Sequence, residues 1–259
     1  MTQWVTFLSD FGLEDSYVAE VKAVLLSRVP GIGIVDITHQ VASYQVEWAA
    51  FQLRRSYSYF PKGTLHLAIV DPGVGTLRKN LYIKTRDYAF VGPDNGVLAW
   101  AVEQCEAREG KAAQRYEIPV PPGIAPTFYG RDVFAPFIAS LLRKEAGKLK
   151  RLKQMVGRPF PKPQKEKGVW KGEILGWDQF GNVITNIEFV SQSRVQGRIA
   201  GLRDPIFEAN NYLAIEAGKV GLIRGSHGFW EIACRMGSAA DLLRVKPGDS
   251  VTVFSLKSK

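Results

Sequence analysis

The chain has 259 residues, and at about 150 residues per domain this length predicts one large or two modest domains. Hydrophobic residues make up 46% and charged residues 23%, which excludes collagen-like, disordered and disulfide-scaffold proteins. The formal net charge is +9, and eleven basic and two acidic residues between Arg143 and Lys171 account for all of it. The rest of the chain is balanced, so we do not expect nucleic acid to be a partner.

The sequence carries no signal for a membrane or for a metal. No apolar run approaches the roughly 20 residues that span a bilayer, and the first residues lack the basic and apolar regions of a signal peptide. We therefore expect a cytoplasmic protein. Cys105 and Cys234 lie far apart, and the histidines at 39, 66 and 227 form no cluster, so neither a disulfide framework nor a zinc site is predicted.

Short apolar runs alternate with helical patterns in residues 1–150. The apolar runs, which predict strands, lie at 4–8, 32–37, 65–70, 82–85 and 88–91. The helical patterns lie at 14–28, 43–59, 96–103 and 133–143. Strands that alternate with helices predict an α/β domain with a layered, mostly parallel sheet.

A basic, proline-rich stretch follows at 151–168, where GRPFPKPQKEKG has three prolines and no apolar periodicity. It is typical of an extended linker. Residues 169–259 then hold short β-rich runs separated by Gly, Asn and Asp, at 168–178, 182–189, 197–202, 211–216, 220–225, 229–234 and 249–256. Their spacing predicts an all-β domain, a small barrel or a sandwich.

Two aspartates follow the first predicted strand. Asp10 stands at its carboxyl end in LSDFG, where open α/β sheets place their ligand crevice. Asp15 precedes the next helix and either caps it or faces the same crevice. Ending a strand and capping a helix would also explain both residues.

The segment AIVDPGVGTLR is more informative, because a buried strand runs directly into Asp71 and a Pro-Gly-x-Gly turn. Arg78 lies seven residues on and can fold back toward Asp71. A carboxylate and a guanidinium at a crevice can orient a water molecule, while a structural salt bridge at a turn is the alternative.

Three further motifs add polar and aromatic groups. TFYGRDVFAP places Tyr129 at a helix start, and GPDNGVL reads as a turn with Asp94 or Asn95 as a cap. WDQFGNVITNI gathers an aromatic ring with amide and carboxylate groups, which suits a flat polar heterocycle or an ordinary β-turn. The last motif, SHGFWEIACRMGSAA, is either a ligand-recognition loop or an ordinary β-loop. These last two motifs hold Asp178, Phe180, Asn182, Ser226, Glu231 and Met236.

The usual signatures of other enzyme classes are missing from the sequence. There is no Gly-x-Gly-x-x-Gly, no phosphate-binding Gly-Lys-Ser/Thr loop and no nucleophile elbow. Hydride transfer, kinase chemistry and acyl-enzyme chemistry lose support.

Taken in order, SDFG, VDPGVGTxR, GPDNGVL, TFYGRDVFAP, WDQFGNVITNI and SxGxxEIA resemble the S-adenosyl-L-methionine (SAM) hydroxide adenosyltransferases, or SAM hydrolases, which are related to fluorinases and chlorinases. The resemblance implies an α/β domain followed by an antiparallel β-barrel, in a homotrimer with active sites between subunits. It also implies attack of water or hydroxide on the 5′ carbon of SAM, giving adenosine and L-methionine, with SAM as substrate and neither cofactor nor metal.

The resemblance also assigns roles by position. Asp71 and Arg78 match two members of an Asp-Arg-His triad that holds the water, and Asp10 matches a ribose ligand. The other matches are Asp15, Asp178 and Ser226 near the methionine part, Tyr44 and Phe180 near the rings, Asn182 and the Met236 backbone at the adenine edge, and Glu231 as a further substrate contact.

Tyr129 departs from the family pattern, which has histidine in TFHGRD. A phenol with a pKa of about 10 is a poor base at neutral pH, although its hydroxyl can still orient water. Two alternatives to hydrolysis therefore stay open: a SAM- or adenosine-binding protein with little turnover, and halogenase-like use of another nucleophile. The halogenases lack the Asp-Arg pair, and Asp71 would repel a halide ion, so hydrolysis ranks first.

Overall fold

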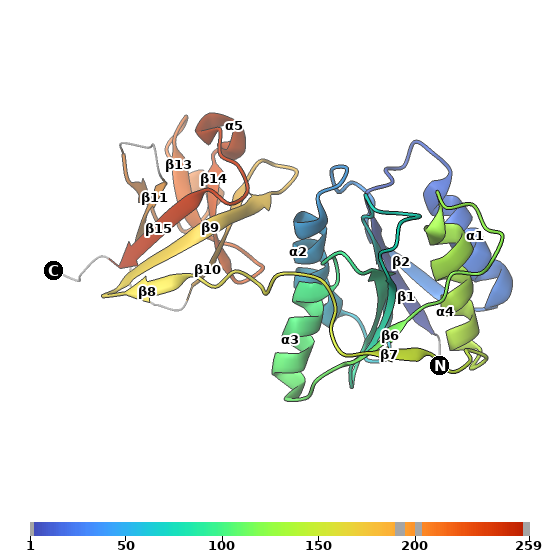
Figure 1. The fold of residues 1–259 in the computed structure, drawn as a ribbon. Coiled ribbons are helices and arrows are strands. Elements are labelled where there is room, and N and C mark those ends of the chain that lie inside the picture. Colours follow the sequence, from blue (N-terminus) through green and yellow to red (C-terminus); the bar gives the residue numbers. More distant parts are fainter. Residues whose placement is uncertain (1–2, 190–194, 200–203, 256–259) are drawn as a thin grey trace. The chain divides into compact units, whose positions relative to one another are not determined.

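The computed structural model describes residues 3–189, 195–199 and 204–255. The chain divides into two compact units, Met1–Phe160 and Pro161–Lys259 (Figure 1). None of the helices in the described residues is long and apolar enough to cross a membrane. Both cysteines, Cys105 and Cys234, are buried free thiols.

The first unit is built on one mixed sheet. Its strands, in spatial order, are β2 (Gly33–Thr38), β1 (Trp4–Ser9), β3 (Leu65–Ile69), β5 (Ala89–Pro93), β4 (Asn80–Lys84), β6 (Gln114–Glu117) and β7 (Lys150–Leu152). The pairs from β2 to β5 are parallel, and the pairs from β5 to β7 are antiparallel. Every residue of β3 is buried, which is why this run is apolar throughout rather than alternating.

Helices cover both faces of this sheet (Figure 1). One face carries α1 (Tyr17–Arg28) and α4 (Ala135–Leu142), and the other carries α2 (Val46–Ser56) and α3 (Ala99–Glu109). Each face has an apolar core of its own. Short helical turns follow α2 and precede α4, namely η1 (Tyr57–Tyr59) and the π-helical η2 (Gly130–Phe134).

The second unit is a nearly closed antiparallel barrel. Its strands, in spatial order, are β12 (Ile206–Phe207), β11 (Val195–Ile199), β15 (Ser250–Ser255), β9 (Val169–Trp177), β10 (Val183–Glu188), β14 (Phe229–Cys234) and β13 (Val220–Arg224), with β8 (Gln164–Glu166) beside β9. The Ala209 amide donates to the Leu222 carbonyl at 2.8 Å, which joins the chain after β12 to β13. A helical turn, η3 (Tyr212–Ala214), and a short helix, α5 (Ala239–Leu243), complete the unit.

The predicted fold class, an α/β domain followed by an antiparallel β-barrel, is confirmed. One predicted strand is wrong, because 211–216 contains η3 rather than a strand. The Asn211 side chain accepts from the Ala214 amide at 3.0 Å and caps this turn. Residues 200–202 of the run predicted at 197–202 lie outside the described residues.

The stretch predicted as a linker, 151–168, contains secondary structure. Most of β7 and all of β8 lie in it, and the two compact units meet at Phe160 and Pro161. Both strands are short and largely charged, with the sequences KRL and QKE. Neither therefore shows the alternation of apolar and polar residues from which a strand is predicted.

Candidate active site

The Asp71–Arg78 pair lies in the loop between β3 and β4. Arg78 Nε donates to Asp71 Oδ1 at 2.7 Å, and Arg78 Nη2 donates to Asp71 Oδ2. The guanidinium therefore binds the carboxylate in a bidentate manner, through two parallel hydrogen bonds. The side chains are only 10% and 6% exposed. Such a pair holds the Asp71 carboxylate in one orientation with its charge largely shielded from bulk water.

Two asparagines hold this pair through hydrogen bonds, one to the Arg78 side chain and one to the main chain before Asp71. Arg78 Nη1 donates to the side-chain oxygen of Asn80, which is buried, and to the Lys79 carbonyl at 3.1 Å. Asn95 Nδ2 donates at 2.7 Å to the carbonyl of Val70, the residue just before Asp71. Sequence reasoning missed Asn80 and interpreted either Asp94 or Asn95 as a helix cap. The nearby α3 has its N-cap at Leu98.

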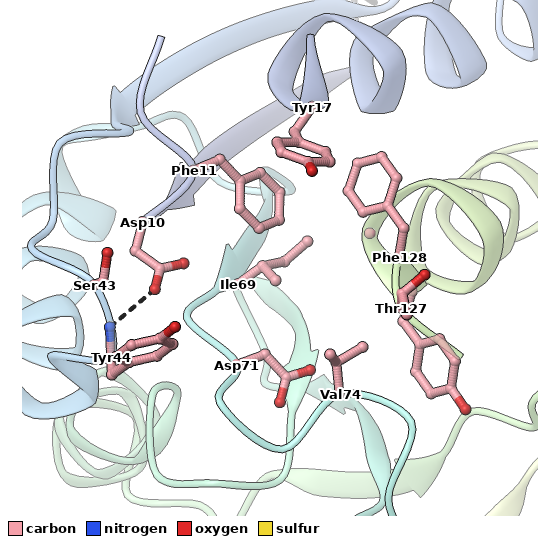
Figure 2. Close-up of a pocket in the computed structure, with 12 residues that line it drawn as sticks. Asp10, Phe11, Tyr17, Ser43, Tyr44, Ile69, Asp71, Val74, Thr127 and Phe128 are labelled. Carbon is pink, nitrogen blue, oxygen red and sulfur yellow. Dashed lines mark hydrogen bonds between the residues drawn. The ribbon is translucent and has the colours of Figure 1, made fainter. Parts of the chain in front are cut away.

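A cavity of about 260 Å³ opens at the carboxyl ends of β1 and β3. The rings of Phe11, Tyr17 and Phe128 gather at one end of it, and the carboxylates of Asp10 and Asp71 lie toward the other (Figure 2). The full lining comprises Asp10, Phe11, Tyr17, Ser43, Tyr44, Ile69, Asp71, Val74, Thr127, Phe128, Tyr129 and Gly130. An apolar wall facing two carboxylates suits a cationic ligand with an apolar part.

Asp10 is held in place by the main chain of Tyr44, whose amide donates to Asp10 Oδ2 at 3.0 Å (Figure 2). Among the described residues, Asp10 Oδ1 has no partner, so it is available to a ligand hydroxyl. Tyr44 has a φ of 70°, a left-handed conformation that is costly for tyrosine, and its side chain is 71% exposed. The Tyr44 ring therefore lies open at the cavity rim.

Tyr129 also lines the cavity and stands directly before η2. It is buried, and its ring centroid lies 5.4 Å from the Arg78 guanidinium carbon, within cation–π range. Tyr129, Arg78 and Asp71 therefore form one cluster. Asp15, in contrast, is exposed and does not line the cavity, and the helix α1 has its N-cap at Ser16.

In the second unit, Asp178 organises the turn between β9 and β10. Its Oδ1 accepts from the amides of Phe180 and Asn182 at 2.9 and 3.0 Å, and its Oδ2 accepts from Asn182 Nδ2 at 3.0 Å. These bonds leave the Phe180 ring 68% exposed. The turn thus presents an aromatic face, while Asn182 is buried and, like Asp178, uses much of its hydrogen-bonding capacity within the turn.

Glu231 is buried in β14 among polar groups that the sequence did not connect to it. Tyr212 Oη donates to Glu231 Oε1 at 2.6 Å, and His227 Nε2 lies 3.3 Å from Glu231 Oε2. Burial, with the bond to Glu231, raises the pKa of Tyr212 to about 12. Ser226 and Met236 are exposed, and Met236 has a φ of 56°.

The structure therefore brings Asp10, Tyr44, Asp71 and Tyr129 to one cavity, with Arg78 bound to Asp71. Asp15 belongs to the first unit but lies outside the lining of this cavity, and the remaining candidates belong to the second unit, namely Asp178, Phe180, Asn182, Ser226, Glu231 and Met236. In the described part of the chain, no group of three or more His, Cys, Asp or Glu side chains could hold a metal ion.

Comparison with known proteins connects both units to one family. The model of the SAM hydroxide adenosyltransferase N-terminal domain matches residues 5–152, and that of the C-terminal domain matches 172–252. The chain belongs to the SAM hydroxide adenosyltransferase family. It is 38% identical to an (R)-S-adenosyl-L-methionine hydrolase of Thermus thermophilus, with 96% of this chain and 99% of that protein covered.

Other relatives agree with this placement. A Salinispora tropica protein of the same name is 32% identical, with 97% of this chain and 98% of that protein covered. A fluorinase of an Actinoplanes species is 26% identical over 96% of each. The crystal structure of a conserved protein from Thermotoga maritima superposes with a TM-score of 0.84 at 35% identity, covering 96% of this chain and 99% of that one.

Proposed function

We propose that this SAM hydroxide adenosyltransferase family member hydrolyses SAM to adenosine and L-methionine. The observation that carries the proposal is the Asp71–Arg78 pair beside a cavity with a second carboxylate, Asp10. Named SAM hydrolases at 38% and 32% identity over nearly the whole chain support the same reaction. The fluorinase relative is more distant.

The reaction needs a positioned nucleophile more than an activated leaving group. The oxygen of water attacks the 5′ carbon of SAM, the carbon–sulfur bond breaks, and its electron pair stays on the sulfur of methionine. The water gives one proton to solvent and its hydroxyl becomes the 5′ hydroxyl of adenosine. A neutral thioether is a good leaving group, so orientation in a site with few competing waters supplies much of the rate.

The residues of the cavity suit this task. Asp71 accepts a hydrogen bond from the attacking water, and Arg78 fixes the carboxylate and stabilises developing hydroxide. Asp10 accepts hydrogen bonds from the ribose hydroxyls through its unpaired Oδ1. In the second unit, Asn182 and the Met236 backbone would bind the adenine edge, Phe180 a ring face, and Asp178, Ser226 and Glu231 further parts of the substrate.

We extend the proposal to assembly, cofactor and location. A homotrimer with sites at subunit interfaces is supported by the resemblance and by exposed large side chains in the first unit, such as Leu13 and, at the cavity, Tyr44. SAM is the substrate, and the reaction as written uses no cofactor. Free cysteines favour the cytoplasm.

Nucleic acid is not proposed as a partner. Basic residues in 143–171 have acidic partners within the protein, as in Lys150–Glu117 and Arg158–Glu47.

The decisive experiment incubates wild type and Asp71→Asn with SAM and separates the products by chromatography. Wild type should release adenosine and methionine in equal amounts, above the spontaneous rate in buffer. Asp71→Asn keeps the shape but not the charge and should lower kcat by about a hundredfold. Absence of both products with wild type would reject hydrolysis.

Tyr129 favours one second candidate, a SAM- or adenosine-binding protein with little turnover. Calorimetric binding of SAM without product release would support it. A halide as nucleophile is disfavoured, because the Asp71 carboxylate lines the cavity and would repel it. Chloride added to the assay should therefore give no chlorinated nucleoside.

A further inference from the structure

Ser9, the last residue of β1, and His39, just after β2, form a buried contact directly behind Asp10. Ser9 Oγ and His39 Nδ1 lie 2.7 Å apart. The two residues are 0% and 3% exposed, so the serine is no nucleophile for a bound ligand. The pair is instead a structural connection between the carboxyl ends of two neighbouring strands.

The turn that carries Asp10 is tied to His39 at both of its ends. At the first end, Ser9 Oγ contacts the imidazole and also accepts from the Phe11 amide at 3.3 Å. At the second end, the Gly12 amide donates to the His39 carbonyl at 2.8 Å. Asp10 lies between these two attachments, so its main chain has little freedom to move away from the cavity.

An aspartate lies on the other side of the imidazole. His39 Nε2 lies 3.1 Å from Asp36 Oδ1, and Lys22 Nζ donates to Asp36 Oδ2 at 2.5 Å. Because Ser9 Oγ already accepts from the Phe11 amide, its own hydrogen is free to donate to Nδ1 of a neutral imidazole. The proton of that ring is then on Nε2, which is close to Asp36 but has no hydrogen-bond geometry toward it. Burial lowers the pKa of His39, which favours this neutral ring.

We propose that His39 is the positioning residue for Asp10, holding both ends of the turn so that the Asp10 carboxylate meets the ribose hydroxyls of the substrate. The inference rests on the proposed function, in which Asp10 binds the ribose. His39 touches no substrate in this scheme; its side chain acts through Ser9, and its main-chain carbonyl holds Gly12 whichever side chain stands at position 39. Its loss should weaken binding of SAM and of adenosine more than it slows the chemical step.

The chain offers a matched control. His66 in β3 is equally buried, and its Nδ1 lies 2.8 Å from the hydroxyl of Thr6, also in β1. The imidazole packs against the rings of Tyr57 and Phe90, and among the described residues its hydrogen-bond partner is Thr6 rather than a residue of the Asp10 turn. Substitutions of His66 therefore report what the loss of a buried histidine does to the fold alone.

The experiment compares His39→Ala and His39→Asn with His66→Ala and His66→Asn in the full chain. His39→Ala should raise KM for SAM, and Kd for adenosine by calorimetry, by about tenfold, the effect of one hydrogen bond, with a smaller change in kcat. His39→Asn should recover much of this loss, because its Oδ1 can replace Nδ1 as acceptor. The His66 variants should lower Tm and leave both constants unchanged.

Two results would overturn the proposal: unchanged KM and Kd in folded His39→Ala, or equal increases in His39→Ala and His66→Ala. If His39→Ala does not fold, Ser9→Ala removes the same contact, with Thr6→Val as its control.

Hydrogen exchange separates this proposal from the proposed function. The Phe11 amide should exchange faster in His39→Ala than in His66→Ala, whatever the protein binds, because its acceptor Ser9 Oγ loses the imidazole that orients it. Unchanged protection would refute the role of His39 even if wild type hydrolyses SAM. Faster exchange in a protein without SAM turnover would instead refute the proposed function and keep His39 as the holder of the turn.

Discussion

Tyr129 contacts the same guanidinium that holds Asp71. Its ring lies 5.4 Å from the Arg78 guanidinium carbon and lines the cavity, so a group at this position can reach a bound water. A tyrosine hydroxyl can donate or accept a hydrogen bond there, but it takes up a proton poorly at neutral pH. Under the proposed function, the residue at this position would influence how the proton of the attacking water is transferred.

We expect Tyr129→His to raise kcat for SAM hydrolysis by about tenfold at pH 7. An imidazole with a pKa near 6.5 accepts a proton at this pH, and general-base assistance contributes about a hundredfold or more where geometry is ideal. Product formation should be measured from pH 5.5 to pH 8.5 for both proteins. A lower kcat in the histidine variant would show instead that the phenol takes part in positioning the water.

The buried His66 predicts how stability depends on pH. Burial lowers the pKa of His66 to about 3, whereas the unfolded chain titrates near 6.5. Between these two values the unfolded state binds a proton at this side chain, whereas the folded state does not. The free energy of unfolding should therefore fall as pH drops from about 6.5 toward 3, by up to about 1.4 kcal/mol per pH unit. Above pH 6.5 this contribution is fully present and constant.

Urea unfolding of wild type and His66→Asn at pH 4 to 7 tests this dependence. Asparagine does not titrate, so the variant should show a shallower loss of stability toward acid. Because burial also lowers the pKa of His39, part of the acid dependence should persist. Identical pH dependence in the two proteins would show that His66 does not contribute.

At this scale the sequence predicted the residues that follow strand ends, such as Asp10 and Asp71. It also suggested that Arg78 folds back toward Asp71, but it did not predict the residues that hold the main chain on either side of the two aspartates. Asn95 binds the main chain of Val70, and His39 binds Ser9, across 25 and 30 positions of sequence. A single sequence shows neither partner, because such contacts exist only once strands from separate segments are neighbours in the sheet.

The loop between β3 and β4 carries both Asp71 and Arg78, and one glycine fits it against the segment before Tyr129. Gly75 has a φ of 76°, and a Cβ built there would lie 2.5 Å from the carbonyl oxygen of Pro126. The main chain of the loop therefore lies directly against the 126–129 segment, with no space for a side chain at position 75. Only glycine can both adopt this positive φ without strain and allow this close approach.

Gly75→Ala should consequently destabilise the protein and lower turnover. The left-handed conformation costs about 1 kcal/mol for alanine, and the clash with a main-chain oxygen should add about 1–3 kcal/mol. Gly63→Ala is the control, since Gly63 has a φ of 89° and nothing lies within 4 Å of its added Cβ. Urea midpoints and kcat should separate the two variants, and equal effects in both would place the whole cost in the dihedral angle.

Elements were predictable where apolar periodicity was strong. The runs at 4–8 and 65–70 became β1 and β3, and the pattern at 14–28 became α1. The short strands β6, β7 and β8 were not predictable, because they are mostly polar or charged and are held by main-chain pairing to their neighbours. The runs at 82–85 and 88–91 were predicted as strands and correspond to β4 and β5, but the antiparallel pairing of this half of the sheet, which β6 and β7 complete, was not predicted.

For the whole molecule, each compact unit has apolar clusters of its own. The clusters on the two faces of the first sheet draw only on residues up to Met155, and those of the barrel only on residues from Trp170 onward. The alternation of strands and helices in one half and of short strands in the other was enough to predict this division. The exact boundary was not, because 151–160 packs on the first unit through isolated contacts.

Those contacts make a prediction about truncated chains. The Phe160 ring lies edge-on to Trp100 with centroids 5.2 Å apart, its amide donates to Glu103 Oε2 at 2.7 Å, and the Val156 amide donates to Asp94 at 2.6 Å. Burial of one phenylalanine alone contributes about 1.5–3 kcal/mol. A fragment of residues 1–160 should therefore fold and unfold cooperatively, whereas one of residues 1–150 should be less stable by at least about 2 kcal/mol.

Urea midpoints followed by circular dichroism compare the two fragments, and Phe160→Ala in the longer one identifies the share of the aromatic contact. Neither fragment should release adenosine from SAM, since Asn182 and the other proposed adenine contacts are absent from both. Equal midpoints would move the boundary back to residue 150. Turnover by the longer fragment would show that the first unit alone binds and orients SAM, and it would remove the barrel from the proposed site.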